Sequence, residues 1–507
     1  MPSKIYSAQV SGLSVDIVEI EVDISRGLKS FTIVGLPNSA VREAKDRISA
    51  AIKNAGFESP QKGNRKVIVS LAPADLKKEG PIFDLGIALA NLIALGELSP
   101  EMNKKLFLGE LGLSGELRSI RGALLIAQKA RDAGFEELYL PKENAAEAAL
   151  VPRLSVFGVS HLGEIIDHFT QTRGQRIAAH AHENLQIPLA APHVDFCDIK
   201  GQESAKRALE IAAAGGHNIA MYGPPGTGKT MLAKACSGIL PELSFDAAIE
   251  VTGIHSAAGI LDQPFIAYPP LRSPHHTSSY VSIVGGGTAP KPGEITLAHR
   301  GILFLDEFPE FDSRVIEALR QPLEDRVVSI SRAKGSARFP ADIMLIATMN
   351  PCPCGNRGSS RKECICPPAA ISRYDRKLSG PIVDRIDIWV HVPDIDHEKL
   401  LGTETLGRSS EVQERVKEAR RIQEVRFAQG KIHLNSAMGA RELKEHAPLP
   451  LAAKNMLAQA ATRLGLSARA HHRVIKLART IADLAHSEEI AQEHILEALQ
   501  YRPRTSR

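Results

Sequence analysis

A phosphate-binding pattern occupies residues 223–230, Gly-Pro-Pro-Gly-Thr-Gly-Lys-Thr, after a strand-like apolar run and before a stretch with helical periodicity. Glycines at this spacing allow backbone N–H groups to turn inward around an anion, and the start of the helix adds partial positive charge. We expect Lys229 to reach the β and γ phosphates of a nucleotide and Thr230 to ligate Mg²⁺. A Gly/Pro turn that matches by chance is the alternative, and the flanking strand and helix argue against it. The other expected nucleotide-binding residues are Gly223, Pro224, Pro225, Gly226, Thr227 and Gly228.

Two acidic residues follow a second apolar run, residues 302–305. A carboxylate at a strand end can hold a metal ion, and its neighbour can polarise water, so we assign Asp306 to Mg²⁺ and Glu307 to general base. A third strand-like run ends at Asn350, which we expect to orient the attacking water or sense the γ phosphate. The alternatives are ordinary solvated acids at a strand end and, for Asn350, a turn residue before Pro351.

A parallel sheet is the element that would bring these groups together. From residue 195, apolar runs alternate with amphipathic stretches, which predicts an α/β core over 195–395. Residues 396–507 are expected to form an all-helical region, and residues 1–170 a mixed α+β domain. Residues 171–194 lose periodicity and are predicted to be a linker.

Composition sets limits on the class of protein. The chain has 507 residues, which at about 150 residues per domain predicts about three domains. With 43% hydrophobic and 24% charged residues it is not a disordered or fibrous chain, and its formal charge of +4 neither favours nor excludes nucleic acid. No stretch resembles a signal peptide or a membrane span, so we expect a soluble cytoplasmic protein without a membrane partner.

Four of the six cysteines fall within residues 352–366, in the pattern C-x-C, nine residues, C-x-C. Four thiolates can close a tetrahedral structural Zn²⁺ site, and reduced loop thiols are the alternative. His275 and His276 are also metal-ligand types, but a turn with satisfied imidazoles is the favoured interpretation. The expected zinc ligands are Cys352, Cys354, Cys364 and Cys366.

The motifs at 223–230 and 302–307, together with Asn350, resemble Walker A, Walker B and sensor 1 of the AAA+ ATPases, and the helical region resembles their lid. The resemblance implies ATP and Mg²⁺ as cofactors and a ring in which arginines complete each site. Arg385, within SGPIVDRID, resembles an arginine finger acting in trans, and Arg469, within SARA, resembles sensor 2. Arg473 lies one helical turn further and is the substitute for Arg469; for these arginines, a surface salt bridge is the alternative.

The resemblance extends over nearly the whole chain. Six stretches resemble the magnesium-chelatase-like family known as ComM or YifB, of the helix-2-insert group: VGLPNSAVREAKDRI, LAPADLKKEG, RSPHHTSS, GEITLAHRGILFLDE, NPCPCG and SGPIVDRID. Membership implies a homo-oligomer, a hexameric DNA motor that promotes branch migration in natural transformation.

The N-terminal domain resembles the proteolytic domain of Lon. The position of Lon's nucleophilic serine is Ile82 here, and the region of its partner lysine, residues 121–124, contains no lysine. Peptide hydrolysis by the Lon mechanism needs a hydroxyl nucleophile and an amine base, and both are absent at these positions. We therefore expect a binding or assembly module rather than a protease.

A basic segment precedes the sensor 1 strand, where helix-2-insert enzymes carry a pore hairpin. Residues 326–338 alternate like a hairpin and contain no acid, so Arg332, Lys334 and Arg338 are expected to contact DNA phosphates without reading sequence. A charged edge hairpin protected from aggregation is the alternative. Because the segment has no aromatic residue for base stacking, a rival function stays open, a chelatase-like remodelling chaperone acting on a protein partner.

Overall fold

The computed structural model describes most of the chain, as two compact units. The N-terminal unit comprises Met1–Ile187, Ala248–Ile266 and Ala289–Lys291, and the C-terminal unit comprises Pro188–Ala247, Ala267–Thr288 and Pro292–Arg507. The described residues are 2–99, 101–170, 176–180, 194–287, 290–332, 335–359, 362–394, 407–430 and 432–503, without the side chains of residues 331, 332, 335 and 336.

A seven-stranded mixed sheet forms the centre of the N-terminal unit, in the order β3-β4-β2-β1-β5-β8-β9. The strand β2 is antiparallel to both of its neighbours, and the remaining pairs are parallel. The strands are β1 (Ser3–Ser11), β2 (Ser14–Arg26), β3 (Ser30–Val34), β4 (Arg65–Ala72), β5 (Lys105–Phe107), β8 (Glu137–Pro141) and β9 (Ser155–Val159), beside the short hairpin β6 (Glu110–Leu111) and β7 (Leu117–Arg118).

Helix α1 of this unit begins directly after its N-cap residue, Asn38. The side chain of Asn38 accepts a hydrogen bond of 3.0 Å from the Val41 amide, and the apolar face with Val41, Ile48 and Ile52 is buried. Ile177, within the expected linker, lies against the core of the unit, and its amide donates to His168 Nδ1 at 3.0 Å. The helices are α1 (Ser39–Asn54), α2 (Asp84–Ala94), α3 (Ala123–Asp132), α4 (Lys142–Ala148) and α5 (Leu162–Thr170).

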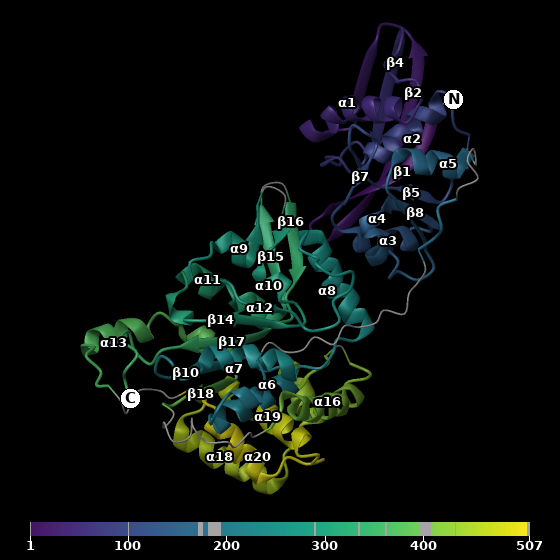
Figure 1. Ribbon diagram of the computed structural model, residues 1–507. Helices are drawn as coiled ribbons and strands as arrows, with labels where there is room; N and C mark the ends of the chain where they lie inside the picture. The colour runs from purple at the N-terminus through teal and green to yellow at the C-terminus, as the bar shows by residue number, and fades with distance from the viewer. Residues whose placement is uncertain are drawn as a thin grey trace. The chain divides into compact units, whose positions relative to one another are not determined.

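A five-stranded sheet organises the C-terminal unit, in the order β11-β14-β17-β10-β18, and all of its pairings are parallel. This confirms the α/β core predicted from the alternation of apolar runs. Helices α6 and α7 lie against β10, β17 and β18 (Figure 1). The elements are β10 (Ile219–Tyr222), β11 (Leu271–Arg272), β14 (Ile302–Leu305), β17 (Met344–Met349), β18 (Ile388–His391), α6 (Glu203–Gly215) and α7 (Lys229–Ala235).

Shorter elements connect these strands. Helix α8 begins in the C-terminal unit and continues into the N-terminal unit. The others are the 3-10 turns Phe196–Asp198, Cys236–Ile239 and Phe308–Glu310, and α8 (Phe245–Ala258), α9 (Tyr280–Val284), β12 (Gly285–Gly286), β13 (Lys291–Pro292), α10 (Glu294–Leu297), α11 (Ser313–Ala318), α12 (Arg320–Asp325), β15 (Val327–Arg332), β16 (Gly335–Pro340), α13 (Pro368–Asp375) and α14 (Gly380–Val383).

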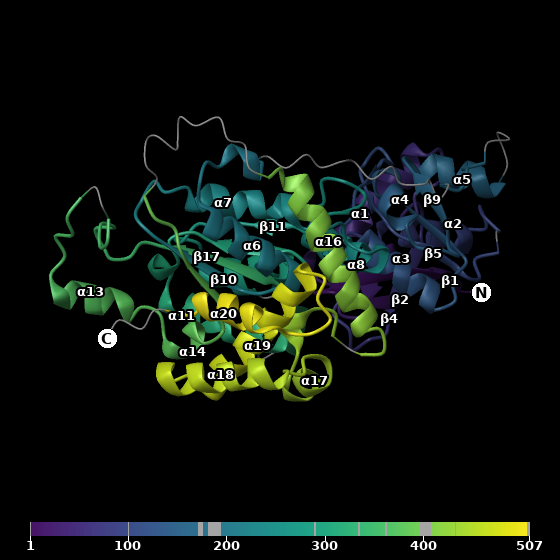
Figure 2. The ribbon, with the colours of Figure 1, turned by 90° about the horizontal axis from the view of Figure 1, so that it is seen from below.

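The end of the chain is helical, as expected, and shares one hydrophobic cluster with the sheet core. Helix α16 lies along α6 (Figure 2), where Arg420 and Gln423 donate to the carbonyls of Ala213 and Ala214 at 2.7 and 3.0 Å. The helices are α16 (Ser409–Arg426), α17 (Ala440–His446), α18 (Leu451–Leu464), α19 (Ala468–Leu484) and α20 (Gln492–Gln500), with a 3-10 turn at Asn435–Ala437.

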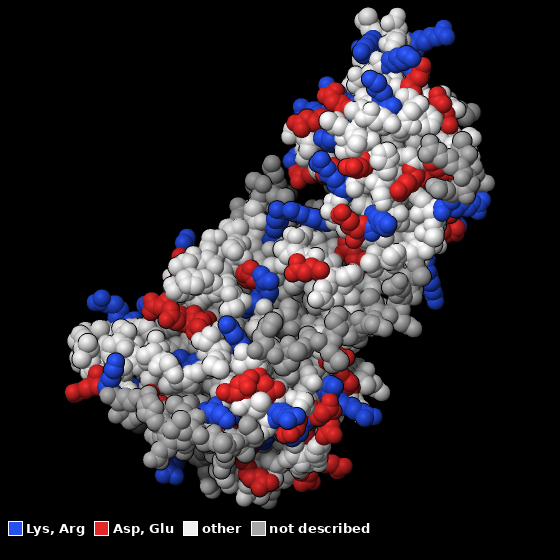
Figure 3. All heavy atoms as spheres, in the orientation of Figure 1, with Lys and Arg blue, Asp and Glu red and all other residues white. Residues whose placement is uncertain are grey.

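Charged side chains of both signs are interspersed over the face in Figure 3, in agreement with the nearly balanced composition. Among the described residues, no helix has the length and apolar character needed to cross a membrane.

Candidate functional site

The phosphate-binding loop connects the end of β10 to the start of α7. Gly226 and Gly228 have φ angles of +78° and +88°, a left-handed conformation that favours glycine. Gly223 is required by packing, because a Cβ there would lie 2.0 Å from the carbonyl oxygen of Val392. The Lys229 Nζ atom donates to the carbonyls of Gly223 and Pro224 at 2.8 and 2.7 Å. Burial lowers the pKa of the Lys229 amine, and the nearby Asp306 carboxylate opposes that shift.

Thr230 and Asp306 present two oxygen ligands at one point. The Thr230 Oγ1 atom lies 2.9 Å from Asp306 Oδ2. Neighbouring ligands of an octahedral Mg²⁺ at about 2.1 Å are roughly 3.0 Å apart, so this donor pair fits the ion. The buried Thr348 hydroxyl and the Glu307 amide both donate to Asp306 Oδ1, which fixes the carboxylate. Thr348 was not among the residues predicted from the sequence, because its role depends on β17 lying beside β14.

Asn350 joins this group because of the strand order. Strand β17 lies between β14 and β10, and the carboxyl ends of parallel strands meet at the same sheet edge. The Oδ1 atom of Asn350 is therefore 3.4 Å from Lys229 Nζ. Three separate motifs thus meet at one edge of the sheet. They contribute Lys229 and Thr230, Asp306, and Asn350.

Glu307 lies near His276, for which the sequence predicted only a turn with satisfied imidazoles. Its backbone is left-handed, with φ of 52°, and its side chain is 54% exposed. The Oε2 atom of Glu307 lies 3.6 Å from the Nδ1 atom of His276. The neighbouring His275 packs against His276, with 4.2 Å between the ring centroids, and its Nδ1 atom lies 2.8 Å from the Thr277 hydroxyl. The histidine pair stands out in the sequence, but nothing in its spacing links it to Glu307.

Arg385, the predicted arginine finger, and Arg469, the predicted sensor 2 residue, form ion pairs with the same carboxylate. Glu324 forms ion pairs with Arg385 through Oε2 and with Arg469 through Oε1, the latter at 3.4 Å. Arg473 is buried and donates to the carbonyls of Ile386 and Asp384 at 2.9 and 3.1 Å, on either side of Arg385. Because main-chain carbonyls occupy the donors of Arg473, this arginine supports the Arg385 segment, and Arg469 is the more exposed of the two lid arginines.

The four clustered cysteines converge in space. Their sulfur atoms all lie within 4.8 Å of one another, and three of the separations are 3.4, 3.6 and 3.7 Å. These distances exceed an S–S bond of about 2.05 Å and approach the roughly 3.8 Å between ligands of a tetrahedral Zn²⁺ with Zn–S bonds of about 2.3 Å. The loop also touches the nucleotide site, because a Cβ on Gly355 would lie 2.8 Å from Cδ of Pro225. The donor set fits a tetrahedral metal ion.

The basic segment forms the antiparallel hairpin β15–β16, with Ser329 opposite Arg338. Arg338 is exposed on β16. Arg332 ends β15, with its side chain outside the described set, and Lys334 lies outside the described residues.

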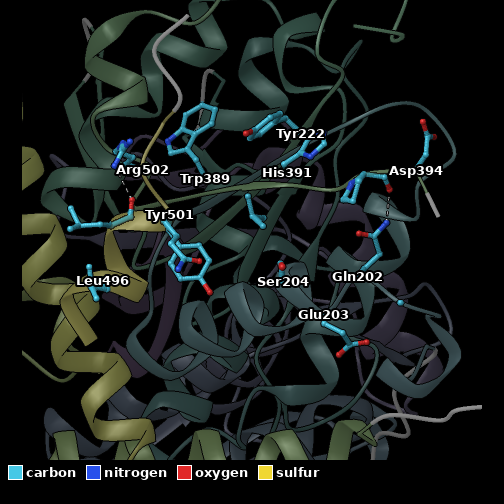
Figure 4. A pocket seen from close by; sticks show the side chains of 15 residues that line it. Gln202, Glu203, Ser204, Tyr222, Trp389, His391, Asp394, Leu496, Tyr501 and Arg502 are labelled. Atoms are coloured by element: carbon cyan, nitrogen blue, oxygen red, sulfur yellow. Dashed lines mark hydrogen bonds between the residues drawn. The ribbon is translucent and has the colours of Figure 1, made fainter. Parts of the chain in front are cut away.

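A pocket that no sequence motif predicts adjoins the phosphate loop. It has a volume of about 890 Å³ and is lined by the start of α6, the ends of β10 and β18, and the end of α20. Figure 4 shows Tyr222, Trp389 and His391 along one side, opposite Ser204. The Gln202 amide on its wall donates to the carbonyls of Thr227 and Pro393, at 3.3 and 2.8 Å. The buried Trp389 indole nitrogen lacks a hydrogen-bond partner among the described residues.

Three family models match the chain, and together they cover most of it. Residues 195–400 match the model described as magnesium chelatase, subunit ChlI. Residues 20–144 match subunit ChlI of Mg-chelatase, and residues 407–502 match the C-terminal model of the same subunit.

Individual proteins of this kind are similar to the chain over nearly its full length. The chain is 42% identical to the competence protein ComM of Haemophilus influenzae, covering 98% of this chain and 97% of that protein. It is 39% identical to the protein YifB of Escherichia coli, covering 99% and 97%. A shorter similarity, 32% over 149 residues, relates 27% of the chain to 26% of Lon protease 2 of Bacillus subtilis.

Proposed function

Because this chain belongs to the magnesium chelatase ChlI family of AAA+ ATPases and is of the ComM/YifB type, we propose that it is a ring-forming DNA motor driven by ATP hydrolysis. The meeting of Lys229 and Thr230 with Asp306 and Asn350 at one sheet edge carries the ATPase part of this proposal. The 42% identity to a competence protein supports the DNA part.

Each residue at the sheet edge has a defined task. ATP with Mg²⁺, when bound, supplies the phosphoanhydride bond and the cation that neutralises developing charge. Lys229 binds phosphate oxygens, while Thr230 and Asp306 hold the cation. Glu307 accepts a proton from the attacking water, and Asn350 keeps that water in line. Arg385 is assigned to the nucleotide of the next subunit in a hexamer, and Arg469 is assigned the sensor 2 role on the lid; the charge of both stabilises the transition state.

The pocket beside the phosphate loop is the proposed place of the nucleoside. It opens next to Gln202, whose amide holds the Thr227 carbonyl, so its position along the sheet edge continues that of the phosphates. Its aromatic lining by Tyr222, Trp389 and His391 suits the flat face of a base.

The β15–β16 hairpin is the proposed DNA contact. Arg332, Lys334 and Arg338 would bind backbone phosphates of single strands or branched junctions, which gives affinity without sequence preference. The proposed activity is branch migration in DNA recombination and natural transformation, in keeping with the printed name of the Haemophilus relative.

Strand exchange on a synthetic four-way junction tests this activity. We expect ATP-dependent strand movement by the full chain and none by Lys229→Ala. Absence of movement at every salt concentration would contradict the helicase. The rival function, remodelling of a protein partner, is favoured by the name of the family models, which describe a chelatase subunit. An ATPase stimulated by a protein partner and indifferent to DNA would establish that rival.

The four-cysteine cluster is the proposed structural Zn²⁺ site, held by Cys352, Cys354, Cys364 and Cys366. None of the six cysteines, all of which lie in described parts of the chain, forms a disulfide, which suits a reducing, cytoplasmic location. The N-terminal unit is proposed to serve assembly or binding rather than proteolysis, because Ile82 stands at the position of the Lon nucleophile.

A further inference from the structure

Helix α12 contacts both the basic hairpin and the two arginines proposed to complete a nucleotide site. It leads directly into β15 of the basic hairpin, and one of its side chains pairs with both the proposed arginine finger and the proposed sensor 2 arginine. Its contacts on both sides are specific enough to be tested.

On the side of the hairpin, Gln321 of α12 forms two hydrogen bonds with Ser329 of β15. The Gln321 amide donates to the Ser329 hydroxyl at 3.1 Å, and the Ser329 backbone amide donates to Gln321 Oε1 at 3.1 Å. Two hydrogen bonds from one side-chain amide restrict rotation as well as distance. Ser329 lies directly opposite Arg338 in the hairpin. Helix α12 therefore binds β15 at the residue that pairs with a proposed DNA contact.

On the arginine side, Glu324 holds Arg385 and Arg469 together. Its side chain is 51% exposed, whereas that of Arg385 is 15% exposed. Two guanidinium groups repel each other, and the shared carboxylate offsets that repulsion. A second contact fixes the same segment, because Arg320 of α12 donates to the Ser379 hydroxyl at 3.2 Å, immediately before α14.

We propose that Gln321 and Glu324 are positioning residues through which DNA contact at the hairpin sets the placement of Arg385 and Arg469 for ATP hydrolysis. This inference rests on the proposed DNA-motor function. Displacement of β15 moves α12 through Gln321, and α12 moves the arginines through Glu324. Neither residue touches the nucleotide of its own subunit in this scheme, so substrate affinity is set elsewhere.

The test uses full-length Glu324→Gln and Gln321→Ala, with ATP turnover measured with and without a junction. For Glu324→Gln we expect kcat to fall by about tenfold at an ATP KM within about twofold of the wild type, with DNA affinity retained. Glu324→Asp keeps the charge and should recover most of that loss. For Gln321→Ala we expect normal turnover without DNA and a stimulation ratio near one with DNA.

Glu414→Gln is the matched control, because Glu414 is an exposed carboxylate paired with Lys417 at 3.2 Å on α16. Exposed ion pairs contribute little to stability, so the three glutamate variants should melt like the wild type. The Gln321–Ser329 hydrogen bonds are also exposed, so Gln321→Ala should melt within a few degrees of the wild type. Wild-type stimulation in Gln321→Ala, or wild-type kcat in Glu324→Gln, overturns the inference. A wild-type enzyme that hydrolyses ATP but does not respond to DNA instead overturns the DNA motor and, with it, the role of Gln321; the loss of kcat in Glu324→Gln without DNA then decides the role of Glu324.

Discussion

The Nδ1 atom of His276 lies 3.6 Å from Oε2 of Glu307, the carboxylate proposed as general base. His276 follows the edge strand β11, whereas Glu307 follows β14, so the contact bridges two adjacent strand ends. We propose that the histidine holds this carboxylate in one orientation. The histidine motif alone does not link His276 to Glu307.

His276→Ala should lower kcat for ATP by about tenfold, whereas removing the base itself should cost about 10²-fold or more. Nucleotide affinity should stay within about twofold, because His276 is assigned to the base and not to the phosphates. His486→Ala is the control, since this exposed histidine pairs with Glu418 at 3.2 Å, whereas the His275 ring packs against His276. Steady-state turnover with a separate binding titration checks this, and equal effects of the two variants would remove His276 from the site.

Arg385 should act on the neighbouring subunit. Lys229→Ala and Arg385→Ala are each expected to reduce ATP turnover by at least about 10². When the two are mixed before assembly, each Arg385→Ala subunit can meet an intact arginine from a Lys229→Ala neighbour, so part of the activity should return. A mixture as inactive as its components would contradict action in trans.

The cysteine cluster should contain about one Zn²⁺ per chain when the protein is purified without chelators. Cys354→Ser should lower both metal content and melting temperature, whereas Cys197→Ser should change neither. Because Gly355 lies against Pro225 of the phosphate loop, we also expect the metal-free protein to hydrolyse ATP more slowly. Metal content near zero in the wild type would refute the site.

Trp389 should report nucleotide binding by fluorescence. It is the only tryptophan of the chain and lines the pocket proposed for the nucleoside. Saturating ADP should change its emission, and Lys229→Ala should weaken that response. If ATP turnover saturates while the emission stays constant, the base lies outside this pocket.

Arg338→Gln should weaken DNA binding and flatten its salt dependence. Removing one cation that binds a phosphate lowers the slope of log K against log salt by about 0.7 for single strands and about 0.9 for duplexes. ATP turnover without DNA should persist. Arg314→Gln removes an exposed cation outside the hairpin, paired with Asp312 at 2.8 Å, and should leave the slope unchanged. A wild-type slope in Arg338→Gln would exclude this residue from the DNA interface.

The fold could be predicted from the sequence where its signals are local. A capping residue at Asn38 or Ser39, followed by an apolar face, predicts the helix that the structure has as α1, and the alternation of apolar runs predicts the parallel sheet. The stretch LFLGELGLSGEL, residues 106–117, has a hairpin-like pattern, and the hairpin that this pattern predicts is only partly right. Strand β5 has three residues, and its parallel pairing with β1 and β8 joins it to the main sheet, so only β6 and β7 form a hairpin. Such short strands carry too little local pattern to specify a partner far along the chain.

By itself, the sequence determined the parts of the site whose chemistry lies within consecutive residues. Lys229 and Thr230 belong to one loop, and Asp306 and Glu307 end one strand, so residue type and spacing suffice. Only the tertiary structure brought Glu324 to Arg469, 145 positions away, and His276 to Glu307. Those pairs depend on strand order and on the packing of helices, and no periodicity relates residues that far apart.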